Sequence, residues 1–284
     1  MKRLLEVLQA ATEYLAARGV ENARLVTEQL LSHVLECPRL QLYVRFESLL
    51  TEPQLEAMRR GMKRLAAGEP LQYVVGDTAF MGHLFKTDRR ALIPRPDTEP
   101  LVEAVLACEP LWARPAPAIV EVGTGTGCIA ISLALAKPAA YTAIDVSPEA
   151  LALARENAER LQVADRVTFQ PGDLLTGLTT NSADAVVANL PYIRTADLAV
   201  LPRHIREHEP VRALDGGEDG LVCIRRLAGE APAVLRPGGW LFLEIGFDQG
   251  EAVRACLTDL GYADVAVCPD AGGRDRVAIG RKPA

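Results

Sequence analysis

One short stretch of this chain combines a strand, a glycine-rich turn and a helix. Residues 119–122 form a mostly apolar run typical of a buried strand, and residues 128–135 are apolar enough for a buried helix. A glycine-rich turn between them exposes the helix N-terminus and lets a ligand approach the backbone closely. This order predicts an α/β fold with a ligand site at the turn. The turn consists of Gly123, Thr124, Gly125, Thr126 and Gly127.

An acidic residue follows the next predicted strand. Residues 141–144 are a second apolar run, and Asp145 stands at its end, 18 residues beyond Gly127. An acidic side chain at this place is positioned to hydrogen-bond a ribose. Ser147 then fits the N-cap of a helix whose first residue is Pro148.

A third buried strand, residues 185–188, runs into the tetrapeptide Asn189-Leu190-Pro191-Tyr192. A planar amino group needs two acceptors for its two hydrogens, and the Asn189 side-chain oxygen and a loop carbonyl can supply them. The Tyr192 ring can stack on the face of that group, so that the nitrogen lone pair points at an electrophile. The alternative is an ordinary polar turn, because Asn and Pro are common turn residues.

The strand ends and the glycine spacing both favour a ligand site over an ordinary turn. Glu121, Asp145 and Asn189 fall at the ends of successive strands, where open parallel sheets bind ligands. The glycine spacing is G-x-G-x-G, whereas a dinucleotide site needs G-x-G-x-x-G. Glu121 would repel a pyrophosphate and favour a ligand that carries an ammonium group and a sulfonium, which S-adenosylmethionine does.

Residues 121–127, Asp145 and the Asn189 tetrapeptide resemble the S-adenosylmethionine-dependent amino-methyltransferases whose motif is N-P-P-Y. Three further strings narrow this resemblance to the PrmC/HemK family, the N5-glutamine methyltransferases of class-1 peptide-chain release factors. The resemblance runs from about Leu4 to the C-terminus. The strings are Ile93-Pro94-Arg95-Pro96-Asp97-Thr98-Glu99, Gly216-Gly217-Glu218-Asp219-Gly220-Leu221 and Ala271-Gly272-Gly273-Arg274-Asp275-Arg276-Val277.

The resemblance implies a Rossmann-like, seven-stranded methyltransferase domain whose last strand is antiparallel, with a small N-terminal helical domain joined to it by a β-hairpin. It implies S-adenosylmethionine as cofactor and methyl transfer to the N5 of a glutamine, the GGQ-motif glutamine, in class-1 release factors. The predicted catalytic residues are Asn189, Leu190, Pro191 and Tyr192. The predicted cofactor-binding residues are Glu121, Gly123, Thr124, Gly125, Thr126, Gly127, Asp145, Asp173, Leu174 and Asn189.

Asp173 and Leu174 follow a predicted strand at residues 167–170, which places Leu174 against the adenine and Asp173 near its amino group. Leu190 stands where the family pattern has proline. A leucine keeps the backbone carbonyl that accepts from the substrate amide, and Pro191 biases residue 190 toward an extended conformation. No residue is an obvious general base.

The chain is expected to divide near residue 70. Helical periodicity dominates residues 1–70, where Thr51 to Gln54 fits a capping box and Gly68 a helix stop. Residues 72–87 are expected to form a β-hairpin with its turn at Gly82-His83, and residues 195–220 a long loop. From Asp97 onward, helices and strands alternate. The predicted parts are a partner-docking domain at 1–70, a β-hairpin linker at 71–96 and the methyltransferase domain at 97–284.

The composition argues against nucleic acid, a metal ion and a membrane as partners. The net charge is −6, so the overall field does not favour nucleic acid. Residues 1–70 carry ten basic and nine acidic residues and are nearly neutral. The six cysteines are scattered without a C-x-x-C pair, which indicates thiols in a reducing cytoplasm rather than disulfides or metal ligands. No apolar stretch is long enough to span a membrane. We expect a cytoplasmic monomer without a metal.

Three alternatives to release-factor methylation remain at this point. One is methylation of a ribosomal-protein glutamine. Another is amino methylation of a nucleic-acid base, which predicts a basic groove or a target-recognition domain. The last is a non-catalytic cofactor-binding module, which has no need of Asn189 and Tyr192.

Overall fold

The computed structural model describes residues 2–284, and it divides the chain into two compact units. The first unit contains the residues up to Asp77 together with Pro202–His208. The second contains Thr78–Leu201 and Glu209–Ala284. The predicted division into 1–70, 71–96 and 97–284 stays a prediction. Among residues 2–284, no helix combines the length and the apolar character needed to cross a bilayer.

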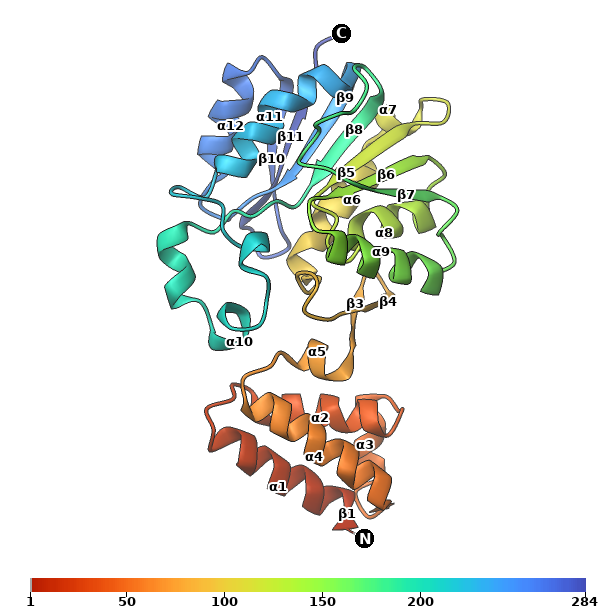
Figure 1. Ribbon diagram of the computed structural model, residues 1–284, viewed down its shortest axis with the longest axis vertical. Coiled ribbons are helices and arrows are strands. Elements are labelled where there is room, and N and C mark those ends of the chain that lie inside the picture. The colour runs from red at the N-terminus through yellow and green to blue at the C-terminus, as the bar shows by residue number, and fades with distance from the viewer. Residues whose placement is uncertain (1) are drawn as a thin grey trace. The chain divides into compact units, whose positions relative to one another are not determined.

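The first unit is helical (Figure 1). Its apolar positions recur at helical spacing and form one core that includes Leu4, Leu15, Leu30, Leu31 and Leu42. The elements are β1 (Lys2–Arg3), α1 (Leu4–Ala16), α2 (Ala23–Val34), α3 (Arg39–Val44), β2 (Leu49–Leu50), α4 (Glu52–Ala66), α5 (Leu71–Val75) and α10 (Arg203–Arg206).

Both predicted ends of α4 are confirmed. The Thr51 side chain accepts from the N3 backbone, and the Gln54 side chain accepts from the Thr51 backbone, which is a complete capping box. Gly68 has a φ of +92° just beyond the helix, a conformation that suits glycine at a helix stop.

The hairpin expected over residues 72–87 is shorter than predicted. Its strands are β3 (Asp77–Phe80) and β4 (His83–Lys86), and Met81 and Gly82 make the turn with positive φ. The prediction of a hairpin is wrong for residues 72–75, because they belong to α5. That helix begins after Pro70 and ends at Gly76, whose φ is +89°.

The second unit is built on a seven-stranded sheet with the order β10-β11-β9-β8-β5-β6-β7. Strands β5 to β9 run parallel, and β11 is antiparallel to both its neighbours, as predicted. The strands are β5 (Ala118–Val122), β6 (Ala140–Asp145), β7 (Val167–Pro171), β8 (Ala183–Ala188), β9 (Leu235–Glu244), β10 (Ala263–Pro269) and β11 (Asp275–Arg281).

Helices cover both faces of this sheet, as Figure 1 shows. Alternate residues of β5 and β8 therefore enter two different cores. Val120 and Val186 pack with residues of α11 and α12, whereas Ile119 and Val187 pack with residues of α6 and α8. The helices are η1 (Pro96–Thr98), α6 (Glu99–Ala107), α7 (Glu109–Trp112), α8 (Cys128–Ala136), α9 (Pro148–Arg160), α11 (Val222–Val234) and α12 (Gly250–Asp259).

Residues 195–220 are not the continuous loop that the sequence suggested. They contain the short helical turns η2 (Thr195–Val200), α10 and η3 (Val211–Ala213). Pro202 and Pro210 directly precede two of these turns. Each turn is only a few residues long, too short to show an apolar period in the sequence.

Candidate functional site

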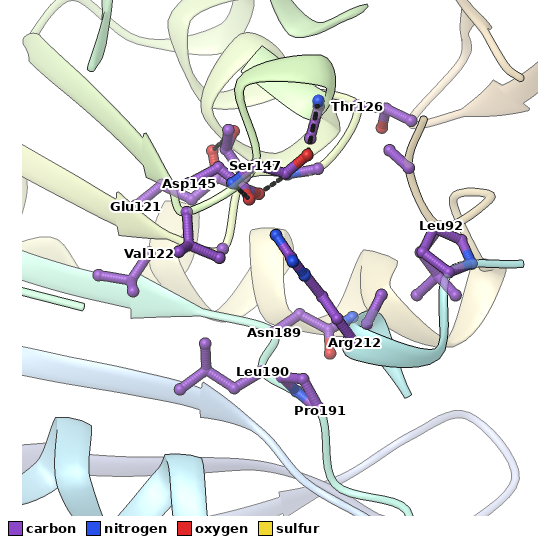
Figure 2. A pocket seen from close by; sticks show the side chains of 18 of the residues that line it. Leu92, Glu121, Val122, Thr126, Asp145, Ser147, Asn189, Leu190, Pro191 and Arg212 are labelled. Carbon is purple, nitrogen blue, oxygen red and sulfur yellow. Dashed lines mark hydrogen bonds between the residues drawn. The ribbon is translucent and has the colours of Figure 1, made fainter. Parts of the chain in front are cut away.

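The carboxyl ends of β5, β6 and β8 border one cavity in the second unit, with a volume of about 530 Å³ (Figure 2). Asp145 and Ser147 lie on one side of it, and Asn189 to Pro191 lie on the other. Of the predicted site residues, those that line the cavity are Glu121, Gly123, Thr124, Gly125, Thr126, Asp145, Asp173, Leu174, Asn189, Leu190 and Pro191.

Gly127 and Tyr192 are the two predicted site residues that do not line the cavity. Gly127 is the N-cap of α8 with a φ of +82°, and a Cβ there would lie 2.8 Å from Ile131 Cδ1. This glycine is therefore required by close packing of the helix. The Tyr192 hydroxyl donates to Glu244 Oε1 at 3.2 Å, and burial raises the Tyr192 pKa above its usual range.

Asp145 holds the glycine turn and the start of α9 together. Its Oδ2 accepts from the Gly125 backbone N–H at 2.8 Å, and its Oδ1 accepts from that of Ser147 at 2.9 Å. Each carboxylate oxygen keeps a further lone pair. Asp145 can therefore accept from ribose hydroxyls without releasing either backbone group, which fits the predicted role.

Glu121 presents a buried carboxylate to the cavity. Its Oε2 accepts from Thr124 Oγ1 at 2.6 Å and from the Ala130 backbone N–H at 3.1 Å, whereas its Oε1 is buried without a partner. Burial raises the Glu121 pKa to about 8, although these hydrogen bonds oppose the shift. A cationic group in the cavity would favour the ionised form, so the residue suits an ammonium-bearing ligand.

The Asn189 side chain is oriented by Thr98, the N-cap residue of α6. Its Nδ2 donates to Thr98 Oγ1 at 3.0 Å, across 91 residues of sequence. Within residues 2–284, no group donates a hydrogen bond to Asn189 Oδ1 or to the Leu190 carbonyl. Two neighbouring residues that line the cavity thus each keep an acceptor that a ligand can use.

Leu190 is accommodated in the place of the family proline. Its side chain is 5 % exposed and belongs to the same core as Val122 and Leu221. It also fills the space beside Gly123, where an added Cβ would lie 3.2 Å from Leu190 Cδ2. Packing therefore restrains residue 190, which lines the cavity.

Three further residues pack against the backbone of the tetrapeptide, and the sequence did not predict these roles. Gln249 is buried, and its Nε2 donates to the Tyr192 carbonyl at 3.0 Å while its Oε1 accepts from the Gly246 N–H at 2.9 Å. A Cβ at Gly216 would lie 2.7 Å from the Pro191 carbonyl oxygen, and a Cβ at Gly220 would clash with that of Tyr192. The glycine string of residues 216–221 is therefore explained by close backbone contact. Its only sequence signal was the family resemblance.

The residues that line the cavity fit the expected cofactor, S-adenosylmethionine. Gly123 and Gly125 have φ values of +74° and +55°, which glycine adopts at little cost and which let a ligand lie against the backbone. Glu121 offers an unpaired oxygen, and Asp145 offers acceptors for a ribose. Among the described residues, no group of three or more histidines, cysteines or carboxylates is placed to hold a metal ion.

Comparisons with known proteins identify relatives of this chain. Residues 6–76 match the family model described as the PrmC N-terminal domain, and residues 119–208 match one described as a methyltransferase domain. A release factor glutamine methyltransferase of Geobacter sulfurreducens is 44 % identical over 97 % of this chain and 95 % of its own length. One of Moorella thermoacetica is 46 % identical over 96 % of each chain. The crystal structure of a methyltransferase from Pyrococcus furiosus is 18 % identical, with a TM-score of 0.54, over 82 % of this chain and 100 % of its own.

Proposed function

Because the chain belongs to the release factor glutamine methyltransferase family, we propose that it transfers a methyl group from S-adenosylmethionine to the N5 of the GGQ-motif glutamine in class-1 release factors. The observation that carries this proposal is the pair of acceptors at the cavity edge. Asn189 Oδ1 and the Leu190 carbonyl match the two N–H groups of a carboxamide.

The cofactor residues and the substrate residues have separate tasks. Glu121, residues 123–126, Asp145, Asp173 and Leu174 line the cavity and would hold the cofactor, with Asp173 and Leu174 assigned to its adenine. When bound, S-adenosylmethionine supplies a methyl group already activated by a positively charged sulfur. Asn189 and Leu190 hold the amide, whose nitrogen is a poor nucleophile because its lone pair is delocalised. Fixing such a group in line can lower a barrier by about 7–11 kcal/mol.

Labelling experiments test the proposed substrate. The full-length protein is incubated with a labelled methyl donor and purified class-1 release factors, and the label is located by peptide mass. We expect label on the GGQ glutamine. Parallel reactions with ribosomal proteins and with DNA or RNA test the two alternatives, and label found only in these reactions would reject the proposal.

We also propose that the helical unit docks the protein substrate. Two apolar side chains on α3, Leu40 and Val44, are 77 % and 84 % exposed and are spaced one helical turn apart. Exposed apolar side chains that neighbour one another are typical of interaction surfaces. We propose a cytoplasmic monomer with no direct contact to nucleic acid or membrane.

Replacing Leu40 and Val44 together with serine tests the docking surface. We expect the KM for the release factor to rise about tenfold, because the apolar area buried on docking is lost. The kcat and the cofactor affinity stay unchanged. Leu260→Ser removes an exposed leucine of the second unit and serves as the control. An unchanged KM in the double variant would contradict docking through α3.

A further inference from the structure

Several arginines line the cavity at the strand ends, namely Arg89, Arg90, Arg95, Arg212 and Arg226. Three of them, Arg90, Arg95 and Arg226, form ion pairs with carboxylates. Arg89 also has an interaction partner. Among residues 2–284, no hydrogen bond or ion pair engages the Arg212 side chain. Of the described arginines at this cavity, Arg212 is therefore the one whose guanidinium is still available to a ligand.

Arg212 lies in η3, on a segment that is anchored to another part of the cavity lining. Three residues before it, the buried Glu209 side chain accepts from the Ile93 backbone N–H at 3.2 Å. Figure 2 shows the Arg212 side chain extending from this segment into the cavity, between Asp145 and Asn189. Its guanidinium is thus aimed at the region where the predicted cofactor-binding residues meet.

The amino-acid end of S-adenosylmethionine carries two opposite charges, and only one of them has a partner so far. Its ammonium group needs acceptors, and the unpaired Oε1 of Glu121 is one. The ribose hydroxyls need acceptors as well, which Asp145 offers. The carboxylate is the single anionic group of the ligand, and it needs hydrogen-bond donors instead.

The glycine turn has few donors left for a carboxylate. Its backbone N–H groups already donate to carbonyl oxygens or to Asp145 at Gly123, Thr124, Gly125 and Gly127. The Thr124 hydroxyl donates to Glu121 at 2.6 Å. Within residues 2–284, the turn thus keeps only the Thr126 N–H, and one N–H cannot satisfy two carboxylate oxygens. The competing donors are the first backbone N–H groups of α8.

We propose that Arg212 binds the carboxylate of S-adenosylmethionine. A guanidinium is planar and always charged, and its parallel N–H groups match the two oxygens of a carboxylate. With Glu121 at the ammonium group, each charge of the amino-acid end then has a partner of opposite sign. This inference rests on the cofactor of the proposed function and is independent of the substrate that receives the methyl group.

Arg212→Met, titrated calorimetrically with two ligands, tests the inference on the full-length protein. The substitution removes the guanidinium and keeps an unbranched side chain, so the dissociation constant of S-adenosylmethionine should rise roughly 10- to 100-fold. Decarboxylated S-adenosylmethionine lacks only the carboxylate and should bind this variant no more weakly than it binds the wild type. Equal losses for the two ligands would overturn the inference. An unchanged affinity for S-adenosylmethionine would also overturn it and would assign the carboxylate to the N–H groups of α8.

S-adenosylhomocysteine supplies a second comparison, because it keeps the carboxylate and lacks the positive charge on sulfur. Its affinity should fall in Arg212→Met by about the same factor as that of S-adenosylmethionine. A loss confined to S-adenosylmethionine would show that Arg212 does not act on the carboxylate, and the inference would fail. Arg254→Met, an exposed change on α12 outside the cavity lining, is the matched control and should alter none of the three affinities.

These titrations contain no release factor, so they separate failure of this inference from failure of the proposed function. A protein that methylated no release factor, but lost affinity in Arg212→Met only for the ligands with a carboxylate, would contradict the proposed substrate and support the inference. If Arg212→Met instead kept all three affinities and raised the KM for the release factor, Arg212 would contact the protein substrate. That result would overturn the inference and leave the proposed function standing.

Discussion

Asn189→Ala should lower methyl transfer to the release factor by at least about 100-fold, because the amide nitrogen loses the contact that aligns it with the methyl donor. The substitution removes Oδ1 from the cavity edge and leaves the Leu190 carbonyl as the single remaining acceptor. Asn189 makes no hydrogen bond to the glycine turn or to Asp145. Cofactor affinity should therefore stay within about threefold of wild type, a change of less than about 1 kcal/mol.

Single-turnover transfer measured with pre-bound cofactor, together with calorimetric titration of the cofactor, checks both parts of this prediction. Thr168→Ala, an exposed change on β7, controls for handling and folding. Transfer that remained within a few-fold of wild type would show that Asn189 does not hold the glutamine. A large loss of cofactor affinity would instead place Asn189 mainly in the cofactor site.

The sheet and the positions of its ligand-facing ends could be predicted from the sequence because both are local properties of the chain. Each parallel strand buried on both faces is a short apolar run, as residues 185–188 are. Glu121 lies near the end of such a run, and Asp145 and Asn189 come directly after one. Since the carboxyl ends of parallel strands lie at one edge, these residues were expected to meet, and all three line one cavity.

The contacts that orient the site could not be predicted in this way. Asn189 meets Thr98 across 91 residues, and the Tyr192 hydroxyl and carbonyl meet Glu244 and Gln249 across 52 and 57. No local period or turn signal encodes such pairs. The extra helix α5 was missed for a different reason. Five residues are too few to distinguish a helix turn from the start of a strand.

Asp145→Ala should have the opposite kinetic signature to Asn189→Ala. The Asp145 carboxylate accepts from the backbone N–H groups of Gly125 and Ser147 and faces the cavity. Losing it removes the predicted ribose contact and also leaves two backbone donors without their partner. Hydrogen bonds to a charged group contribute about 1.5–3 kcal/mol each, so we expect the dissociation constant of S-adenosylmethionine to rise roughly 100-fold.

Asp145→Asn tests whether the carboxylate or merely its shape is needed. Both carboxylate oxygens already accept from backbone N–H groups, so an asparagine must turn its NH2 group toward one of these donors. The isosteric variant should therefore bind cofactor nearly as weakly as the alanine variant, and both should recover most of the wild-type kcat at saturating cofactor. Cofactor titration and kcat measured against cofactor concentration check these two effects separately. If Asp145→Asn bound the cofactor with wild-type affinity, other residues would have to hold the ribose. The substitution necessarily disturbs the hydrogen bonds that the Gly125 and Ser147 backbone N–H groups donate to Asp145.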